Sequence, residues 1–252
     1  MDCHLLAGLI LSSLIGLILG LVGGGGAIVT VPVLVYVLGV DEHDAVAMSL
    51  AVVGVTSIIG TAIQSKSSNV DYRTGLIFAA VGAVGATAGA QLTYLLSPRA
   101  LMLLFGIIML LTGSLMLGRQ IRQTSEQQQQ KLSKLLLASL LVGVLTGFLG
   151  VGGGFLIVPA LLLFGGLDVK RAVGTSLLVI AINCIAGFLG HLSSSHLPVT
   201  LTAMVTAVAT LGMLIGTALS RQLSADVLKK AFSVFVIAVA IFLIIKNHGV
   251  IF

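Results

Sequence analysis

Long apolar runs separated by short polar segments dominate the chain. There are eight such blocks, at residues 5–38, 45–63, 74–96, 99–118, 135–167, 172–190, 199–220 and 225–245. A helix that crosses the hydrocarbon core of a bilayer needs about 20 apolar residues, because each residue adds about 1.5 Å along a core of about 30 Å. Blocks two to four and six to eight therefore each predict one membrane-spanning helix.

The first and fifth blocks are too long for one straight crossing, and each has a glycine run in its middle. The runs are Gly23–Gly26 and Gly150–Gly154, the second interrupted by Val151. Glycine in a helix interior costs about 1 kcal/mol relative to alanine, and Pro32 and Pro159 follow the runs, so each helix is expected to break. We expect two helical arms joined by glycine. Whether the arms cross the bilayer or meet halfway as a re-entrant hairpin stays open.

The chain also repeats itself at an offset of 127 residues without a gap. Between residues 16 and 50, 14 of 35 pairs are identical, including Pro32 with Pro159 and Asp41 with Asp168. Proline and aspartate are rare in this sequence, so their coincidence indicates an internal duplication. The polar segment 119–134 then separates a first transmembrane repeat, residues 5–118, from a second, residues 135–246.

Composition identifies the solvent that surrounds these helices. Hydrophobic residues make up 58% of the chain and charged residues only 8%, with a mean hydropathy of +1.19. A soluble domain carries about 25% charged residues, so this is an integral membrane protein of the all-α polytopic class. The net charge of +5 lies in loops between apolar spans, where it sets membrane orientation, and we set nucleic-acid binding aside.

The basic residues distinguish two topologies. If the first and fifth blocks each cross once, the thirteen Lys and Arg residues divide 7 to 6 between the two sides; if each block returns to the side where it began, they divide 11 to 2. The positive-inside rule favours the second arrangement, with residues 119–134 as a cytoplasmic linker and both termini periplasmic. Each repeat then makes an odd number of net crossings, so the fold is predicted to consist of two inverted repeats.

Inverted repeats with glycine-broken helices are typical of secondary transporters, whose substrate site lies near the midplane between repeats. The runs should open short helices at Ala27 and Phe155, where free backbone N–H groups and the positive end of the helix dipole favour an anion. The candidate anion contacts are Gly23, Gly24, Gly25, Gly26, Gly150, Gly152, Gly153 and Gly154. The alternative is that glycine only permits close helix packing, which explains Gly16, Gly20, Gly85, Gly89, Gly212 and Gly216 well.

A polar stripe follows the second block of each repeat. It consists of Ser49, Thr56, Gly60 and Gln64 in the first and Ser176, Asn183, Gly187 and His191 in the second. Spacings of seven and four residues place each set on one helical face, which we expect to line the cavity between the repeats. Hydroxyls can instead bond back to their own helix, and this is the expectation for Ser57 and Thr61. Asn183 has no such easy partner and is the best single candidate.

No Asp or Glu lies in the interior of a predicted span. All eight Asp and Glu residues fall in loops or at helix ends, and Asp41 and Asp168 are expected to cap the helices that follow them. His191 could titrate near neutrality, although a solvated histidine at a helix end is the commoner situation. The sequence therefore predicts no metal and no cofactor, and transport driven by the anion's own gradient and the membrane potential.

These residues resemble the TauE/SafE family of anion transporters, often called sulfite exporters. The resemblance rests on the doubled glycine-rich segment that ends in Val-Pro (residues 23–32 and 150–159) and on the run Ala-Val-Gly-Thr-Ser-Leu at 172–177. It adds Thr175 as a polar contact, whereas Met48 replaces that threonine in the first repeat. It implies export of a small oxyanion, sulfite or an organosulfonate such as sulfoacetate, across a bacterial inner membrane.

Two functions of other classes were weighed against transport. An intramembrane enzyme would need a nucleophile such as Ser176 beside a base such as His191, but fifteen residues on one helix separate them by about 22 Å. A membrane scaffold without transport would leave the paired glycine breaks unexplained. The sequence thus predicts a transporter whose only ligand is a small oxyanion and whose surroundings are the lipid bilayer.

Overall fold

The computed structural model describes residues 3–24, 26–92, 98–118, 132–149, 154–191 and 198–247, and the regular structure of this part is entirely helical. The helices are α1 (Cys3–Val22), α2 (Gly26–Tyr36), α3 (Glu42–Ser65), α4 (Tyr72–Leu92), α5 (Pro98–Gly118), α6 (Leu132–Leu149), α7 (Gly154–Leu163), α8 (Val169–His191), α9 (Val199–Gln222) and α10 (Ala225–Asn247). Each block predicted to cross once forms one helix, and the first and fifth blocks each form two. The all-α prediction is confirmed, and the first glycine break is seen at Gly23 and Gly24; residues 150–153 of the second run lie outside the described residues.

The short helices α2 and α7 begin at Gly26 and Gly154, one residue before the predicted starts. They contain 11 and 10 residues, or about 16 Å of helix, which is half of a bilayer core. Pro32 and Pro159 lie inside these helices and do not end them. The prolines therefore do not end the short helices, contrary to the part that the sequence assigned them in the breaks.

Both short helices end in the same way. Gly39 after α2 and Gly166 after α7 have φ values of 66° and 62°, in the left-handed region that glycine adopts without a steric cost. The N–H of Val40 bonds to the Leu34 carbonyl at 3.0 Å, and at the equivalent position the N–H of Leu167 bonds to Leu161 at 3.3 Å. The 127-residue offset therefore matches hydrogen bonds as well as residue types.

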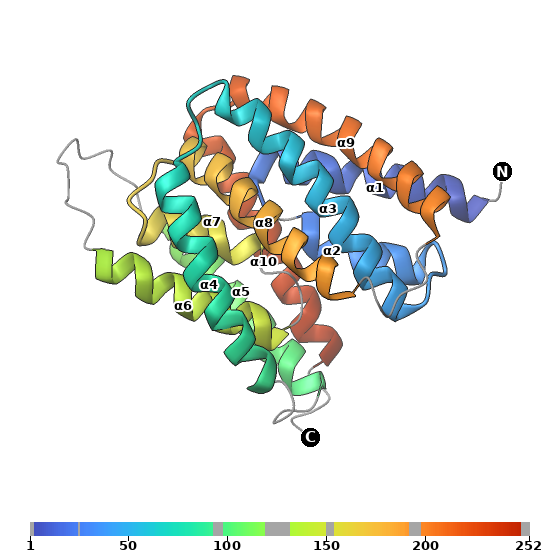
Figure 1. The fold of residues 1–252 in the computed structure, drawn as a ribbon, viewed down its shortest axis with the longest axis horizontal. Coiled ribbons are helices and arrows are strands. Elements are labelled where there is room, and N and C mark those ends of the chain that lie inside the picture. The colour runs from blue at the N-terminus through green and yellow to red at the C-terminus, as the bar shows by residue number, and fades with distance from the viewer. Residues whose placement is uncertain are drawn as a thin grey trace.

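Helices pair across the two halves of the chain (Figure 1). Helix α1 packs on α9, and the equivalent helices α6 and α4 pack on each other. Helix α3 packs on its own equivalent α8, and α5 on its equivalent α10. This pattern is unchanged when the halves are exchanged. The core therefore lies between the halves, and α3 and α8 occupy its centre (Figure 1).

Equivalent helices that touch run in opposite directions. A Cβ atom built on Gly54 of α3 would lie 3.1 Å from the Cys184 Cβ of α8, and one on Gly60 would lie 3.0 Å from Leu177. Contacts that advance along α3 thus retreat along α8. The same holds for α5 and α10, where Gly106 faces Ile244 and Gly113 faces Ile237.

Glycine allows the outer pairs to pack backbone against backbone. A Cβ atom on Gly16 would collide with the Ala209 carbonyl, and one on Gly212 with the Ser13 carbonyl. In the equivalent pair, Gly85 faces the Leu140 carbonyl. Small residues at helix contacts are typical of bilayers, where packing substitutes for the hydrophobic effect. The close-packing interpretation is confirmed for Gly16, Gly20, Gly85, Gly212 and Gly216, and Gly89 is buried.

The outer surface is apolar. Large side chains such as Leu14, Val84, Leu111, Leu141 and Ile215 are exposed on the outer helices, an arrangement that water would penalise and lipid would not. Among the described residues, Asp44–Ser65, Val169–Leu189 and Val199–Gln222 are long and apolar enough to cross a membrane by length and composition. The fold is that of a membrane protein.

We predict that Gly212→Leu destabilises the protein in detergent. The new side chain must displace the Ser13 carbonyl, and overpacking of this kind costs about 1–3 kcal/mol. Ala207→Leu is the matched control, because Ala207 lies on the same helix with its side chain exposed. Thermal unfolding should show a lower midpoint for Gly212→Leu alone, and equal midpoints would contradict the packing argument.

Candidate functional site

The two glycine breaks lie side by side. A Cβ atom on Gly154, the first residue of α7, would lie 3.1 Å from the Gly24 carbonyl oxygen, and α2 contacts α7. The two half-length helices therefore begin next to each other, although their starts are 128 residues apart in the sequence. Of the other predicted contacts, Gly26 packs on α1, and Gly25, Gly150, Gly152 and Gly153 lie outside the described residues.

Ser176 attaches the first break to α8. Its Oγ lies 2.7 Å from the Gly23 carbonyl and 2.7 Å from the Val173 carbonyl, and its side chain is buried. Gly23 has a φ of 76°, and a Cβ atom there would lie 2.6 Å from this Oγ. Only glycine fits here, both for its backbone conformation and for the approach of α8.

Thr175 stabilises a loop. Its buried Oγ1 accepts a hydrogen bond of 2.9 Å from the Asp71 N–H. The Asp71 carboxylate in turn caps α4 by accepting the Thr74 N–H at 3.0 Å and the Thr74 hydroxyl at 2.9 Å. Thr175 thus fixes the α3–α4 loop to α8. Sequence analysis did not single out this cap, although an Asp three residues before a Thr at a helix start is its usual signal.

The hydroxyl groups along α3 do not all have the hydrogen-bond partners that the sequence predicts. Thr61 bonds back to the Ser57 carbonyl at 2.7 Å, as predicted, but Thr56 on the stripe also bonds back, at 2.8 Å to Val52. The expectation for Ser57 was wrong, because its fully buried hydroxyl has no hydrogen-bond partner among the described residues. Ser57 is equivalent to Cys184 of α8 by the 127-residue offset, and it lies where α3 and α8 cross. Ser49 is buried on the same helix.

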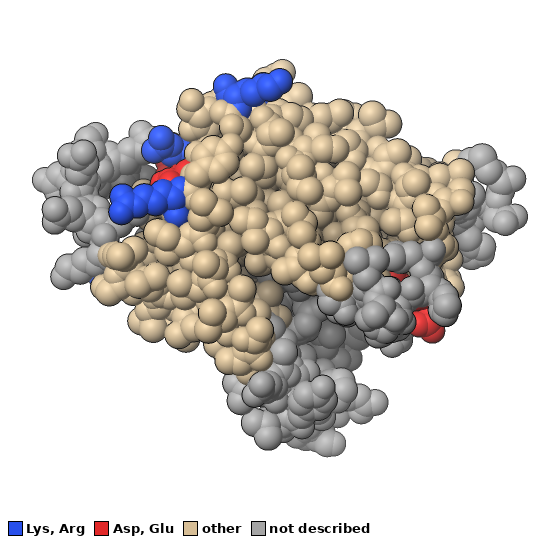
Figure 2. Space-filling view, in the orientation of Figure 1, with Lys and Arg blue, Asp and Glu red and all other residues tan. Residues whose placement is uncertain are grey.

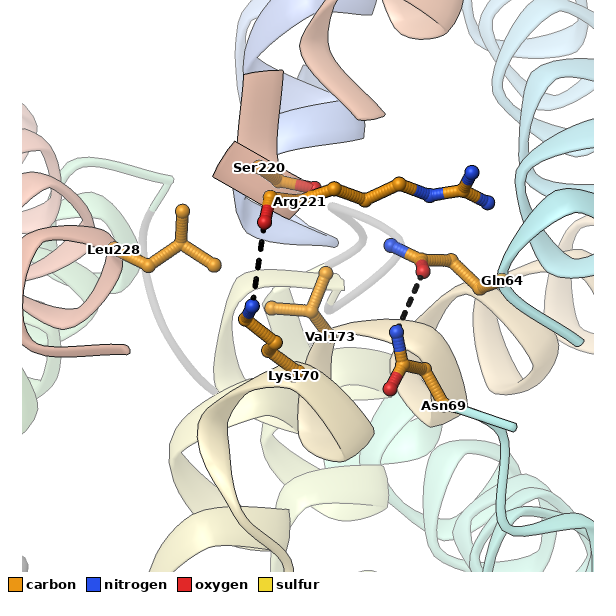
Figure 3. A pocket seen from close by; sticks show the side chains of 7 residues that line it. All are labelled: Gln64, Asn69, Lys170, Val173, Ser220, Arg221 and Leu228. Carbon is orange, nitrogen blue, oxygen red and sulfur yellow. Dashed lines mark hydrogen bonds between the residues drawn. The ribbon is translucent and has the colours of Figure 1, made fainter. Parts of the chain in front are cut away.

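Asn183, the best candidate from the sequence, is half-buried on α8, and no hydrogen bond from its amide to another described residue is found. Gln64 is buried at the end of α3, where its Oε1 accepts a bond of 3.1 Å from the Asn69 amide (Figure 3). The His191 side chain lies outside the described residues.

The face of this stripe is closed by packing along its middle. A Cβ atom on Gly60 would contact Leu177 of α8 at 3.0 Å and the Met213 sulfur of α9 at 3.4 Å, and one on Gly187 would contact Leu50 at 3.2 Å. At these two glycines the stripe therefore faces the other half of the chain. At Gly60 and Gly187 it meets side chains and no open cavity.

Basic side chains gather at one end of the helix bundle, which we call the basic end. It is the end where α3 and α9 finish and α4, α6, α8 and α10 begin. The described members are Lys66, Arg73, Lys134, Lys170, Arg171, Arg221, Lys229 and Lys230. On the face drawn in Figure 2 the blue side chains occupy the upper left, and the red ones include a group at the far lower right.

The predicted helix cap at this end is present. The Asp168 carboxylate accepts the Arg171 N–H at 2.8 Å, which confirms Asp168 as the cap of α8. Asp41 directly precedes α3.

Among the described residues no three His, Cys, Asp or Glu side chains come together as metal ligands would.

Comparison with known proteins gives one family. A family model described as "Sulfite exporter TauE/SafE" matches residues 8–243. A "Probable membrane transporter protein" of Xylella fastidiosa (strain Temecula1) is 36% identical over 241 residues, which are 93% of this chain and 92% of the relative. "Probable membrane transporter protein YdhB" of Bacillus subtilis is 28% identical over 223 residues, 86% of this chain and 91% of the relative. No solved structure matches the chain.

We predict that Gly23→Ala destabilises the protein more than Gly39→Ala does. Both positions have positive φ, which costs an alanine about 1–2 kcal/mol, but only Gly23 also meets the Ser176 Oγ and the Val173 backbone. Nothing lies within 4 Å of a Cβ atom on Gly39. The difference between the two unfolding midpoints therefore reports the steric contact of the added Cβ atom with Ser176 and Val173. Equal midpoints would contradict a close contact between α8 and the first break.

Proposed function

The chain belongs to the sulfite exporter TauE/SafE family, and from this premise we propose that it exports a small oxyanion across the bacterial inner membrane. The observation that carries the proposal is the junction of the two glycine breaks. The half-helices α2 and α7 begin there side by side, as the 3.1 Å approach of a Gly154 Cβ to the Gly24 oxygen indicates. Two positive helix ends converge, and an anion can be held without a cation inside the membrane.

Some polar residues around this junction hold the fold together, and others are left to contact the substrate. Ser176 and Thr175 are supports, because their hydroxyls are engaged with the Gly23 carbonyl and the Asp71 N–H. Thr56 is engaged with its own helix. Asn183 keeps its amide available, and we assign it the direct contact with the substrate. The glycines of both breaks, with Ser49, Gln64 and His191, complete the proposed set.

The proposed mechanism is alternating access between two inverted repeats. Its support is the antiparallel course of α3 with α8 and of α5 with α10, which are equivalent by the 127-residue offset. A site at the junction of the repeats can face either side when one repeat tilts against the other. The hydroxyl of Ser57 is buried on α3 without a hydrogen-bond partner in the described part of the chain, so the packing there is incompletely satisfied.

The direction of transport follows from charge. An inside-negative potential favours the exit of an anion by about 2.3 kcal/mol per charge at 100 mV, so no coupling ion is required. Sulfite and organosulfonates such as sulfoacetate are small and anionic, with several oxygens that accept backbone N–H bonds. An enzymatic role finds no support in the geometry of Ser176, whose hydroxyl faces two backbone carbonyls and no base.

We predict that reporter fusions at residue 126 and at the carboxyl terminus report opposite sides of the membrane, with residue 126 cytoplasmic. The eight basic side chains of the basic end all belong to the set that this topology places in the cytoplasm. A further fusion in the loop after α3, at Ser67, should agree with residue 126. Reports of the same side from residue 126 and the terminus would overturn the inverted repeats.

We predict that proteoliposomes containing the protein move sulfite or sulfoacetate, and that Asn183→Leu lowers this flux at least tenfold. The leucine has a similar volume but offers the anion no hydrogen bond, and one bond to a charge contributes about 1.5–3 kcal/mol. Thr87→Val is the matched control, since it also removes a polar group from a helix but at an exposed hydroxyl bonded to its own backbone. A wild-type protein that moves no oxyanion of a broad panel would refute the proposed function.

A further inference from the structure

A recess opens at the basic end, where four helices and one loop meet (Figure 3). It is lined by Gln64 at the end of α3, Asn69 in the α3–α4 loop, Lys170 and Val173 of α8, Ser220 and Arg221 of α9, and Leu228 of α10. Five of these seven side chains are polar, and two carry a positive charge. No part of the proposed set except Gln64 belongs to the recess.

The two cations of the recess are held in place by backbone carbonyls. The Lys170 ammonium donates to the Arg221 carbonyl at 3.4 Å, and the Arg221 guanidinium donates to the Ile63 carbonyl at 3.1 Å. Both carbonyls belong to the last turn of a helix, where carbonyl groups have no hydrogen-bond partner within the helix. Neutral carbonyls orient the cations but leave their charge uncompensated.

No carboxylate neutralises this charge among the described residues. The recess has no acidic lining residue, and neither Lys170 nor Arg221 makes an ion pair there. Three acids lie two residues along the chain from a lining residue: Asp71, Asp168 and Asp226. Asp71 and Asp168 direct their carboxylates to the N-terminal turns of their own helices, and Asp226 lies in the first turn of α10. The described lining therefore carries a net positive charge, and a positive potential of this kind attracts an anion.

Gln64 adds a directed hydrogen-bond donor. It is 3% exposed, and its Oε1 is fixed by the Asn69 amide at 3.1 Å. Its amide nitrogen is thereby turned into the recess, where no described residue accepts from it (Figure 3). Ser220 lies opposite, 4% exposed, and donates to the Thr217 carbonyl, so its oxygen can still accept. A buried amide donor aimed at the space between two cations suits an oxygen anion.

Val173 separates the recess from the first glycine break. Its side chain lines the recess, and its backbone lies against Gly23, whose Cβ would come within 2.7 Å of the Val173 oxygen and 2.9 Å of its Cα. Ser176, which bonds both the Val173 and Gly23 carbonyls, joins these two elements. One residue thus lies between the recess and the junction of the breaks.

We infer that this recess is an anion-binding site at the cytoplasmic mouth, which captures the oxyanion through Lys170, Arg221 and Gln64 before it passes Val173 to the glycine breaks. The role in capture rests on the proposed function; the binding of an anion does not. The headgroup of an anionic phospholipid offers the same chemistry as a free oxyanion, because it too presents several oxygens and a negative charge at the membrane surface. The test must therefore separate the two sources.

The first measurement is sulfite efflux by reconstituted full-length protein in neutral phosphatidylcholine. The double variant K170Q/R221Q should raise the KM for sulfite on the cytoplasmic side about tenfold and change the maximal rate little, because capture and not passage is weakened. R171Q/K230Q is the matched control. It removes the same two charges from exposed positions at the same end, outside the recess. Equal KM values for the two double variants would overturn the capture role.

The second measurement is binding without transport. Sodium sulfite at constant ionic strength should raise the thermal midpoint of the wild-type protein and of R171Q/K230Q, and part of this shift should be lost in K170Q/R221Q and in Gln64→Leu. Undiminished shifts in both recess variants would overturn the site even if wild-type flux is normal. A wild-type protein that is stabilised by sulfite through the recess but transports none would instead refute the proposed function and leave the site standing.

The third arm identifies the source of the anion. Phosphatidylglycerol is added to the vesicles, and the KM of wild type and K170Q/R221Q is measured again. If phosphatidylglycerol raises the KM for sulfite of the wild type but not that of K170Q/R221Q, the lipid and sulfite compete for the recess, which supports the site. A variant that loses only its response to phosphatidylglycerol, with the KM for sulfite in neutral lipid equal to that of wild type, would reassign the recess to lipid and overturn capture.

Discussion

Everything else in this molecule depends on the need to satisfy backbone polar groups where water is absent. A helix that stops inside a membrane leaves N–H and carbonyl groups unbonded, and such groups are tolerated there only when protein or a cavity surrounds them. The two breaks meet this requirement by lying against each other and against α8. The Ser176 hydroxyl accounts for the Gly23 carbonyl, and the two paired short helices are held at the centre of the fold by the crossing of α3 and α8.

The same requirement explains why glycine serves two different purposes. In the outer pairs, as at Gly16 and Gly212, its missing side chain lets two complete helices approach backbone to backbone. At Gly23 it provides a φ of 76° as well, which ends a helix and exposes its carbonyl to Ser176. The first use stabilises the packing of complete helices, and the second ends a helix inside the fold. Glycine thus permits both the close packing of the outer helices and the end of α1 at the first break.

The sequence was sufficient for the frame because hydrophobic length and glycine content are local properties. All eight apolar blocks became helices, and the breaks fell where four glycines or their equivalents occur. Hydrogen-bond partners are not local, and here prediction was weaker. Thr175, which was expected to contact substrate, accepts the Asp71 N–H from 104 residues away, a bond that no local pattern predicts. Ser57 was expected to bond its own helix and has no partner among the described residues, while Thr56 on the polar stripe bonds its own helix. The recess of Lys170 and Arg221 could not be predicted from the sequence either, because its lining comes from five segments that only the fold brings together.

The duplication copies the fold but not the chemistry of its two ends. The 127-residue offset pairs Lys170 with His43, Gln64 with His191 and Asn69 with His196, so three of the chain's five histidines stand at positions equivalent to the lining of the recess. Lysine and the amides keep one charge state across physiological pH, whereas histidine does not. A carrier with two chemically identical mouths would bind its anion equally well on both sides. The recess carries permanent charge at Lys170 and Arg221, whereas the equivalent positions hold His43 and Tyr94, so the proposed capture of the anion would belong to one side of the membrane although the fold is duplicated.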